Sequence, residues 1–402
     1  MNYDVIIIGA GASGISAAIR AAERNRTVLL LEKLDQPGKK ILASGNGRCN
    51  IMNTASPRYY GDPLFVQQAM QCCSATDLIS FFKQYGLMLS QESEGRVYPV
   101  TFQASTVLSV LKNALKMYNV QIKTKTAALS VLPKDGHFCV LTSNGETFHT
   151  NSVIVSCGGS AQPRLGGTDA GYEILKRIGH TVLQTFPALV PLLTDSRSIS
   201  GLAGVRIKCN VSVFDESDEL LHTEAGEVLF TDYGISGICV MQCARFVYAR
   251  QTYLLLDFLK GIFPDEAAAF TEIKRKQKIY SDFSPLTLLN GILNDHISYA
   301  VCKQAGIALR GEKASELSDE NLRNIIRAAS AYRINITGTK GFEYAQVTAG
   351  GADCCEFEAS TMESKLVPGL FATGETLNVD GDCGGYNLMF AFISGLIAGN
   401  NV

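Results

Sequence analysis

The chain has 402 residues, of which 46% are hydrophobic and 18% are charged, and its formal net charge is −2 at pH 7. This length allows roughly two or three domains with large cores, and the composition excludes an intrinsically disordered chain. No long cationic run is present, and duplex nucleic acid is therefore not expected as a partner, because phosphate binding needs concentrated Lys and Arg.

The sequence also shows no membrane span, signal peptide or redox cysteine motif. No apolar stretch approaches the roughly 20 residues of a membrane span, and the opening MNYDVIIIGAGASG lacks the cationic flank and cleavage site of a signal peptide. We therefore expect a cytoplasmic protein without membrane contact. The twelve cysteines include no CxxC pair, so we expect free thiols. No metal-ligand spacing is visible, and the oligomeric state is left open.

The first predicted elements are a strand, a glycine-rich turn, a helix and a second strand. Tyr3–Ile8 is dominated by β-branched residues, which is typical of a buried parallel strand. GAGASG (9–14) follows at once, and the Ala-rich segment Ile15–Arg24 favours a helix. The second strand, Thr27–Leu31, ends at Glu32.

This order of elements predicts a nucleotide site. Gly9 permits a tight turn, Gly11 lets the backbone approach a pyrophosphate, and Gly14 lets the helix pack closely on the strand. The N-terminus of the helix offers unpaired amides and a partial positive charge. Glu32 stands where a carboxylate accepts hydrogen bonds from ribose hydroxyls, and an acid there disfavours a 2′-phosphate.

The next segments alternate between loops, helices and strands. PGKKILASGNGRCN (37–50) is a loop rich in glycines, cations and other donors. Helices are expected near Ser74–Tyr85 and Thr106–Met117. Strands are predicted at 120–123, 127–133, 137–142, 146–150 and 153–156, with turns at 134–136 and 144–145. The last strand runs into Cys157-Gly158-Gly159. His180 follows a predicted helix, and we expect it to be a cap or a surface residue.

The middle of the chain reads as an insertion. Pro187 and Pro191 mark the passage from the cofactor domain into the inserted region. Residues 192–259 are mostly strand-like, with one helix after Gly237. Residues 263–331 read as several helices. Strands 333–337 and 344–348 lead back.

A second strand–loop–helix unit lies near the C-terminus. Leu370–Thr373 ends at Gly374-Glu375, and a glycine-rich loop leads into the apolar helix Tyr386–Ala398. A site built from two distant segments is what an extended FAD requires, and a helix N-terminus near the flavin would stabilise the anion formed on reduction. No second complete glycine motif or redox cysteine pair follows, which excludes the disulfide-reductase class. NADH or NADPH would therefore dock only transiently.

We accordingly predict an α/β protein with a Rossmann-like, glutathione-reductase-like FAD-binding domain in two segments, together with a β-rich insertion domain and a helical subdomain. The predicted boundaries are 1–188 with 335–402 for the FAD-binding domain, 189–260 with about 332–345 for the β-rich domain, and 261–331 for the helical subdomain.

The chain resembles a family of bacterial NAD(P)/FAD-dependent flavoprotein oxidoreductases, the BaiN-like and aminoacetone-oxidase-like proteins, over almost its whole length. The motifs that carry the resemblance are GAGASG (9–14), GKKILASGNGRCN (38–50), GRVYP (95–99), CGGS (157–160), GEVLFTDYGISG (226–237), QVTAGG (346–351), TMESKLVPGLFATGE (361–375) and DGDCGGYN (380–387). Thr373 and Ile238-Cys239 depart from the residues common in the family.

The resemblance implies that the loop after Glu32 runs along the FAD pyrophosphate and ribityl chain toward the flavin. Together with the two glycine-rich segments, it leads us to expect FAD contacts from Gly9, Gly11, Ala12, Ser13, Gly14, Glu32, Lys33, Gly38, Lys39, Lys40, Ser44, Gly45, Gly47, Arg48, Cys49, Asn50, Gly158, Gly159, Gly374, Glu375, Gly384, Gly385, Tyr386, Asn387 and Leu388. We expect Cys49 to line the cofactor or the core rather than to act as a nucleophile.

The resemblance also implies an activity. Some members of the family reduce conjugated double bonds of 3-oxo bile acids, so we expect an NAD(P)H-dependent reductase of a small apolar enone, a class that includes 3-oxo steroids and bile acids. The first candidate proton donor is Tyr386, followed by Tyr98 and Arg48. Two alternatives stay open: an FAD-dependent oxidase of a small amine, and a flavin-binding protein that acts on RNA.

Overall fold

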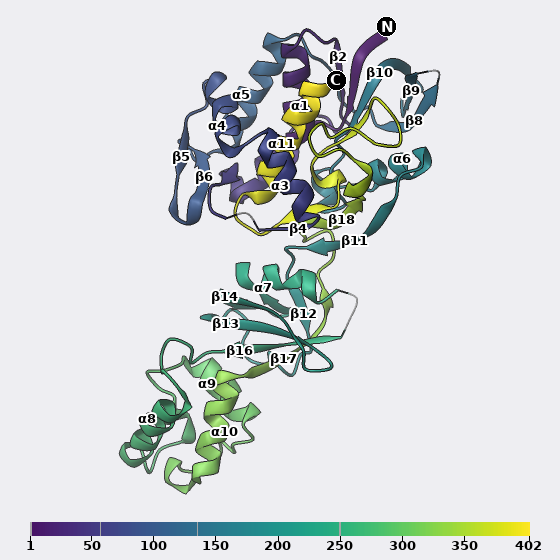
Figure 1. The fold of residues 1–402 in the computed structure, drawn as a ribbon. Coiled ribbons are helices and arrows are strands. Elements are labelled where there is room, and N and C mark those ends of the chain that lie inside the picture. Colours follow the sequence, from purple (N-terminus) through teal and green to yellow (C-terminus); the bar gives the residue numbers. More distant parts are fainter. Residues whose placement is uncertain (1, 57, 135, 249–250) are drawn as a thin grey trace. The chain divides into compact units, whose positions relative to one another are not determined.

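The computed structural model describes residues 2–56, 58–134, 136–248 and 251–402. They form two compact units (Figure 1). The first combines the chain up to Pro187 with Ala345–Val402, and the second contains Ala188–Tyr344. Two distant parts of the sequence therefore build the first unit together. The further division of the second unit into a β-rich and a helical domain stays a prediction.

The first unit is built on a mixed seven-stranded sheet. Its strands are β1 (Asn2–Ile8), β2 (Val28–Leu31), β7 (Gln121–Lys123), β8 (Ala128–Lys134), β9 (His137–Thr142), β10 (Thr147–Val155) and β19 (Leu370–Ala372). The order is β7-β2-β1-β10-β9-β8, and β19 also pairs with β10. β1, β2, β7, β10 and β19 pair in parallel. All four residues of β2 are buried, which explains its continuous apolar sequence.

The two strands predicted at 146–150 and 153–156 are a single strand, β10. Its first residues pair with β9 in antiparallel register, and from His149 to Val155 it pairs with β1 in parallel. The prediction of two strands was wrong because β10 changes partner along its length, and its side-chain pattern changes with the partner. Asp135, in the predicted turn 134–136, lies outside the described residues.

Seven helices of the described residues belong to the first unit: α1 (Ala12–Glu23), α2 (Lys39–Ala43), α3 (Pro63–Cys72), α4 (Ala75–Gln84), α5 (Ala104–Met117), α6 (Ala170–Ile178) and α11 (Tyr386–Asn401). α4 starts with a capping box in which Ser74 and Asp77 satisfy each other's amides. α11 is apolar on nearly all sides because it is buried in the core. No helix among the described residues is long and apolar enough to cross a membrane.

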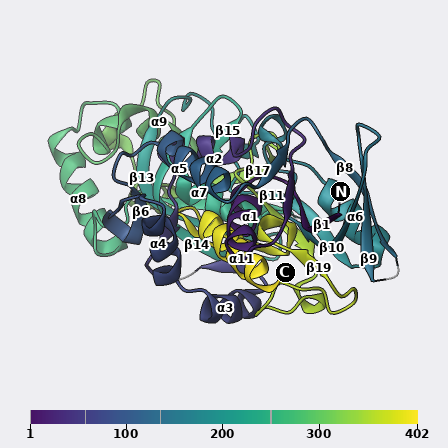
Figure 2. The ribbon, with the colours of Figure 1, turned by 90° about the horizontal axis from the view of Figure 1, so that it is seen from above.

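Helices α1 and α11, from opposite ends of the chain, lie side by side (Figures 1 and 2). A Cβ atom added to Gly395 would lie 2.2 Å from the carbonyl oxygen of Ser13, and one added to Gly399 would lie 2.5 Å from that of Ala17. Glycine is therefore required at both positions for the backbones to approach. Since the residue numbers of the contacts rise together, the two helices run in the same direction.

Three small sheets complete the first unit. β3 (Met52–Asn53), β6 (Arg96–Pro99) and β5 (Leu89–Gln91) form one sheet, β20 (Val379–Gly381) pairs with β4 (Tyr59–Gly61), and β11 (Val182–Ala188) pairs with β18 (Val347–Ala352). The β4–β20 and β11–β18 pairs again join early and late parts of the sequence.

The second unit contains a closed six-stranded barrel of order β12-β15-β14-β13-β16-β17. The strands are β12 (Leu192–Thr194), β13 (Arg206–Asp215), β14 (Leu220–Phe230), β15 (Gly234–Ser236), β16 (Thr252–Asp257) and β17 (Tyr332–Thr339), and the helices are α7 (Ile238–Cys243), α8 (Glu266–Ile279), α9 (Asp295–Gln304) and α10 (Asp319–Ser330). Alternate residues of β13, Cys209, Val211 and Val213, are buried, as expected for a strand with one interior face.

His180 is a buried residue of the first unit. Its backbone amide caps α6 by donating to Leu175, as predicted, but its side chain is enclosed, so the alternative of a surface residue was wrong. The ring bonds to Glu356 at 2.8 Å through Nδ1 and to Ser364 at 3.0 Å through Nε2, and it stacks on Phe357. These partners come from a segment 176 or more residues away, which local sequence does not reveal.

Candidate functional site

The glycine turn after β1 packs closely against its neighbours at Gly9 and Gly14 but faces open space at Gly11. Gly9 has a φ of 103°, and a Cβ added there would lie 2.4 Å from the carbonyl oxygen of Ser156. A Cβ on Gly14 would lie 1.9 Å from the carbonyl oxygen of Gly9, so helix and turn pack backbone to backbone. At Gly11 an added Cβ meets nothing within 4 Å, and no side chain caps α1, which begins at Ala12. The helix N-terminus thus faces open space that suits an anionic ligand.

Glu32 is fixed at the end of β2 beside this turn. One carboxylate oxygen accepts from the amide of Ala10 at 3.0 Å, and the other accepts from the amide of Leu34 at 2.8 Å. Each oxygen keeps a second lone pair, so the group can still accept bonds from ribose hydroxyls. Burial lowers the pKa of Lys33, whose Nζ donates to the carbonyl oxygen of Gly167 at 3.4 Å.

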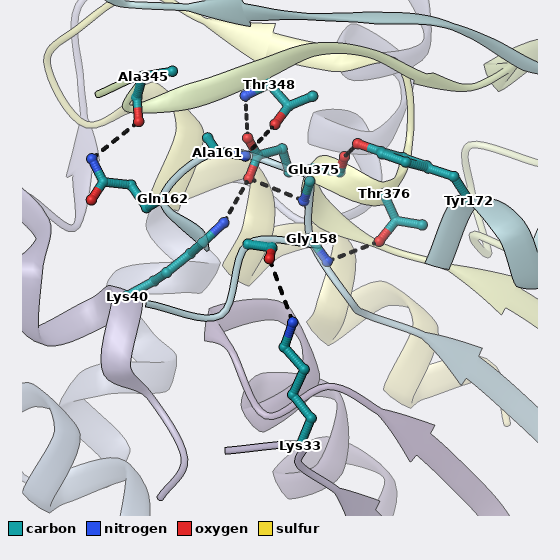
Figure 3. Close-up of polar contacts among 12 residues, drawn as sticks. Lys33, Lys40, Gly158, Ala161, Gln162, Tyr172, Ala345, Thr348, Glu375 and Thr376 are labelled. Atoms are coloured by element: carbon teal, nitrogen blue, oxygen red, sulfur yellow. Dashed lines mark hydrogen bonds and ion pairs between the residues drawn. The ribbon is translucent and has the colours of Figure 1, made fainter. Parts of the chain in front are cut away.

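The two adjacent lysines of the following loop point to different environments. Nζ of Lys39 pairs at 2.7 Å with Asp35, whose side chain is exposed. Nζ of Lys40 is buried without a hydrogen-bond partner among the described residues, although Glu375 lies 3.6 Å away (Figure 3). A buried ammonium with unused donors fits the oxygen atoms of a phosphate. Lys40, rather than Lys39, therefore has the geometry expected of a pyrophosphate contact.

Glu375 links the C-terminal segment to the Cys-Gly-Gly loop (Figure 3). Its carboxylate accepts from the amide of Gly159 at 3.4 Å and from the amide of Thr348. The hydroxyl of Thr376 accepts from the amide of Gly158 at 3.1 Å. The structure thus brings together the glycines at 158–159 and the strand end at 374–375, as predicted from two separate motifs.

Three residues of this cluster were not predicted. Thr348 accepts from the amide of Ala161 at 3.0 Å, and a Cβ on Gly159 would collide with the Thr348 side chain. Tyr172 donates to the carbonyl oxygen of Glu375 at 3.0 Å, and Gln162 donates to the carbonyl oxygen of Ala345 at 3.1 Å. The motif QVTAGG contained the signal for Thr348, but nothing local indicated Tyr172 or Gln162.

The loop 44–50 has an unusual backbone. Gly45 and Gly47 have φ angles of 56° and 82°, and the non-glycine residues Asn46 and Cys49 share this left-handed region with φ of 55° and 58°. Arg48 is exposed, whereas Cys49 is fully buried. Burial raises the pKa of the Cys49 thiol to about 11. The thiol is therefore protonated at neutral pH, which agrees with packing rather than nucleophilic chemistry.

Other predicted contacts in the two loops are backbone approaches or local bonds. Gly38 has φ of 80° and a Cβ there would collide with Leu108, so the glycine is needed for packing at the start of α2. Ser44 donates to the carbonyl oxygen of Ile41 at 2.7 Å. A Cβ on Gly374 would lie 3.0 Å from the hydroxyl of Ser13, which places the C-terminal strand end against α1.

The N-terminus of α11 meets the end of the loop 44–50. Gly385 caps the helix with φ of 109° and no side-chain bond. A Cβ on Gly385 would lie 2.8 Å from Oδ1 of Asn50, and that oxygen is buried without a hydrogen-bond partner among the described residues. An unpartnered acceptor beside a helix N-terminus fits a ligand edge that carries both N–H and carbonyl groups, as the flavin pyrimidine ring does.

The three predicted proton donors differ in burial and in hydrogen bonding. Tyr386 is buried, its hydroxyl donates to the carbonyl oxygen of Ser56 at 3.1 Å, and burial raises its pKa. Tyr98 is half-buried, with Cε1 3.6 Å from the position of a Cβ on Gly45. Arg48 lies at the exposed end of the loop. Tyr386 would have to break its bond to Ser56 before it donated to a substrate.

The two residues after Tyr386 contribute mainly to the protein itself. The side chain of Asn387 both donates to the carbonyl oxygen of Gly381 at 2.7 Å and accepts from its amide at 2.8 Å. Leu388 is partly buried against the core. Gly384 has φ of 137°, and its carbonyl oxygen accepts from Asn53 at 2.9 Å.

Known proteins resemble this chain in sequence over nearly its whole length. The family described as HI0933-like protein Rossmann domain matches residues 3–401. The chain is 35% identical to the 3-dehydro-bile acid delta(4,6)-reductase of Clostridium scindens over 98% of this chain and 97% of the relative. It is 29% identical to the ribosomal RNA dihydrouridine synthase of Escherichia coli over 98% of this chain and 96% of the relative.

A solved structure supports the fold alone. The open conformation of a flavocytochrome c3 fumarate reductase matches 100% of this chain and 78% of that chain, with a TM-score of 0.50 and 14% sequence identity. The predicted fold class, a Rossmann-like FAD-binding domain with added β-rich and helical parts, is confirmed by the family match and this likeness.

Proposed function

Because the chain belongs to the HI0933-like family, we propose that this FAD-dependent oxidoreductase uses NADH or NADPH to reduce a carbon–carbon double bond conjugated with a carbonyl group. The observation that carries the proposal is a chemistry shared by relatives that match nearly the whole chain. One is named a delta(4,6)-reductase of a 3-dehydro-bile acid, and another makes dihydrouridine. Dihydrouridine is uridine whose C5–C6 double bond, conjugated with the C4 carbonyl, has been saturated.

Different residues of the first unit fit different parts of the cofactor. When bound, FAD supplies the ring through which hydride passes from the nicotinamide to the substrate. We assign the pyrophosphate to the open backbone at Gly11 and to the buried ammonium of Lys40. We assign a ribose to Glu32, and the flavin end to the N-terminus of α11 at Gly385 with Asn50 beside it.

Reduction of a conjugated double bond also needs a proton at the carbon next to the carbonyl. We assign this donation to Tyr98, which retains exposed surface beside the loop 44–50, and we assign Arg48 of that loop to stabilising the negative charge that develops on the carbonyl oxygen. We assign Tyr386 to positioning, since its hydroxyl anchors the carbonyl of Ser56. A solvent-exposed donor is readily reprotonated between turnovers.

For the substrate we propose a small apolar enone of the 3-oxo steroid or bile-acid type. The Escherichia coli relative favours a second candidate, reduction of a uridine in ribosomal RNA. Charge argues against it, because residues 188–344 contain 17 Lys and Arg but 19 Asp and Glu, and the first unit is neutral by the same count. RNA-binding surfaces usually concentrate cations.

Anaerobic half-reactions test the proposal. The FAD-loaded protein is first mixed with NADH or NADPH, and bleaching of the flavin absorbance is followed. The reduced protein is then mixed with a 3-oxo-4-ene steroid, 2-cyclohexenone, a primary amine, a uridine-containing RNA or oxygen. We expect bleaching by one nicotinamide and reoxidation by an enone.

Each other outcome changes the assignment. Failure of both nicotinamides to bleach the flavin would refute the reductase as proposed. Reoxidation by RNA but by neither enone would favour the RNA candidate. Direct bleaching by the amine, followed by peroxide formation with oxygen, would indicate an amine oxidase.

A further inference from the structure

One face of the small β3-β6-β5 sheet exposes apolar side chains to solvent. Met88, Val100 and Phe102 have exposed fractions of 64%, 54% and 38%. The amide of Val100 donates to the carbonyl oxygen of Met88, which extends the β5–β6 ladder by one pair beyond Leu89 and Pro99. Since alternate residues of a strand share a face, Val100 lies on the same face as Tyr98, opposite the buried Val97.

This face is continuous with the candidate flavin loop. Tyr98 bridges the two, because Cε1 of its ring lies 3.6 Å from the position of a Cβ on Gly45, while the same ring packs against Phe102 with centroids 5.6 Å apart. On the other side of β6, the amide of Ile51 donates to the carbonyl oxygen of Val97 at 2.9 Å. The backbone that follows Asn50 is thereby bonded to the strand that carries Tyr98.

The backbone of Phe102 is strained in a way that folding does not explain. Its φ is 50°, a region that a bulky L-residue rarely adopts, and its amide donates to the carbonyl oxygen of Pro99 at 2.8 Å to close the turn. A glycine or an asparagine would fit this turn with less strain. The ring packs on Tyr98 but keeps 38% of the residue's surface exposed, and backbone strain at such a residue often marks a functional position.

The cation next to the apolar face is paired with a carboxylate. Arg96, on the same strand as Tyr98, pairs with Glu94 at 2.5 Å, so the guanidinium is already committed to a carboxylate. An apolar and aromatic face whose neighbouring cation is already paired suits a neutral hydrophobic ring system better than a phosphate backbone.

We infer that the face formed by Tyr98, Phe102, Val100 and Met88 binds the hydrophobic rings of the substrate, with Phe102 as the residue that determines preference for large ring systems. This inference rests on the proposed function, since it names the surface that would hold an enone beside the flavin loop. It assigns Tyr98 a contact with the substrate through its ring, whichever residue donates the proton.

Equilibrium binding tests the inference without turnover. The oxidised FAD-loaded protein is titrated with a 3-oxo-4-ene steroid and with 2-cyclohexenone, by calorimetry or by perturbation of the flavin spectrum. Phe102→Asn removes the ring and suits the left-handed backbone. We expect it to weaken steroid binding roughly tenfold, as for the loss of one aromatic contact, and to change cyclohexenone binding little.

A matched control comes from another exposed apolar residue of the first unit. Leu132, on β8, is 57% exposed, and Leu132→Ala should leave steroid binding unchanged. Steroid binding that is unaffected by Phe102→Asn, equally weakened by Leu132→Ala, or undetectable in the wild type would overturn the inference. Loss of binding to a uridine oligonucleotide, with steroid binding intact, would also overturn it and indicate that the rings stack on a base.

These outcomes are distinct from those of the proposed function. Nicotinamide bleaching and reoxidation test the reaction, whereas the titrations test only where the oxidised protein holds the rings. A protein that reduces enones yet binds the steroid equally well with Asn at position 102 would keep its proposed function and lose this surface.

Discussion

Replacing Gly395 with alanine tests the contact between α1 and α11, on which the two-segment cofactor site depends. The added Cβ would lie 2.2 Å from both the carbonyl oxygen of Ser13 and the hydroxyl of Ser16. The oxygen of Ser13 belongs to the backbone of α1, so one helix must move by about 1 Å to restore van der Waals distance. Such overpacking typically destabilises a core by about 1–3 kcal/mol.

Helix propensity opposes this loss. Alanine is favoured over glycine in a helix interior by about 1 kcal/mol. Because the closest contact is with backbone and cannot be relieved by a rotamer change, we take the upper half of the overpacking range and expect a net destabilisation of about 1–2 kcal/mol. The same displacement would move the N-terminus of α11 relative to α1, and we expect roughly tenfold weaker FAD binding.

Two measurements test the expected loss of stability and the expected weakening of FAD binding. Urea unfolding of the FAD-free protein, monitored by far-ultraviolet circular dichroism, reports the stability change, and quenching of FAD fluorescence reports the dissociation constant. Asn400→Ala is the control, since Asn400 is exposed in the last turn of the same helix and should shift stability by less than about 0.5 kcal/mol. If Gly395→Ala matched the wild type in both measurements, α1 and α11 would not be in the contact described.

Three further predictions concern single side chains. Lys40→Met should weaken FAD binding about tenfold by removing a charge-assisted contact, whereas Lys39→Met should not; equal effects would contradict the assignment. Because burial raises the pKa of Cys49 to about 11, iodoacetamide at pH 8 should label it only after unfolding, and mass spectrometry of labelled native protein would expose an error. Burial raises the pKa of Glu356, but the hydrogen bonds from Thr181 and the interaction with His180 together outweigh this effect and leave the pKa below the ordinary value. The carboxylate therefore stabilises the fold above the ordinary pKa of about 4.3 and loses that contribution as the pH falls through the folded pKa. Glu356→Gln should lower the urea midpoint at pH 7 by an amount that shrinks below about pH 4; a constant difference would argue against this sign.

Sequence alone predicted the parts of the fold that depend on local pattern. The segment 3–8, the GAGASG turn and the apolar helix starting at Tyr386 all have short-range causes: continuous β-branched residues, glycine spacing and uniform hydrophobicity. β10 was predicted as two strands because its change of partner is a tertiary property. The closed barrel was foreseen only as a β-rich region, since strand order within it depends on long-range pairing.

In the candidate site, too, some features could be predicted from the sequence and others could not. Glycine positions were predictable because close approach permits no other residue, as the collisions at Gly9 and Gly14 show. The direction of a long side chain was not predictable. Lys39 and Lys40 are adjacent and chemically identical, yet Nζ of Lys39 pairs with Asp35, whereas Nζ of Lys40 is buried near Glu375 without a hydrogen-bond partner among the described residues. Only the positions of Asp35 and the C-terminal strand end distinguish them.

The parallel arrangement of α1 and α11 has a direct electrostatic consequence. Helices that run in the same direction present their positive N-terminal ends on the same side. α11 begins at Tyr386, nine residues before Gly395, whereas α1 begins at Ala12, directly before Ser13. At 1.5 Å per residue, this difference of eight residues makes the N-terminus of α11 project beyond that of α1 by about 12 Å. One positive end therefore faces the open backbone at Gly11, and the other lies farther along, at a distance that a ribityl chain with its phosphate ester can bridge. This offset matches a ligand that has a phosphate at one point and a ring that becomes anionic on reduction at the other. It would not serve a ligand with a single charged end, which is why the contact between the two glycine-bearing helices matters more to this site than any one side chain within it.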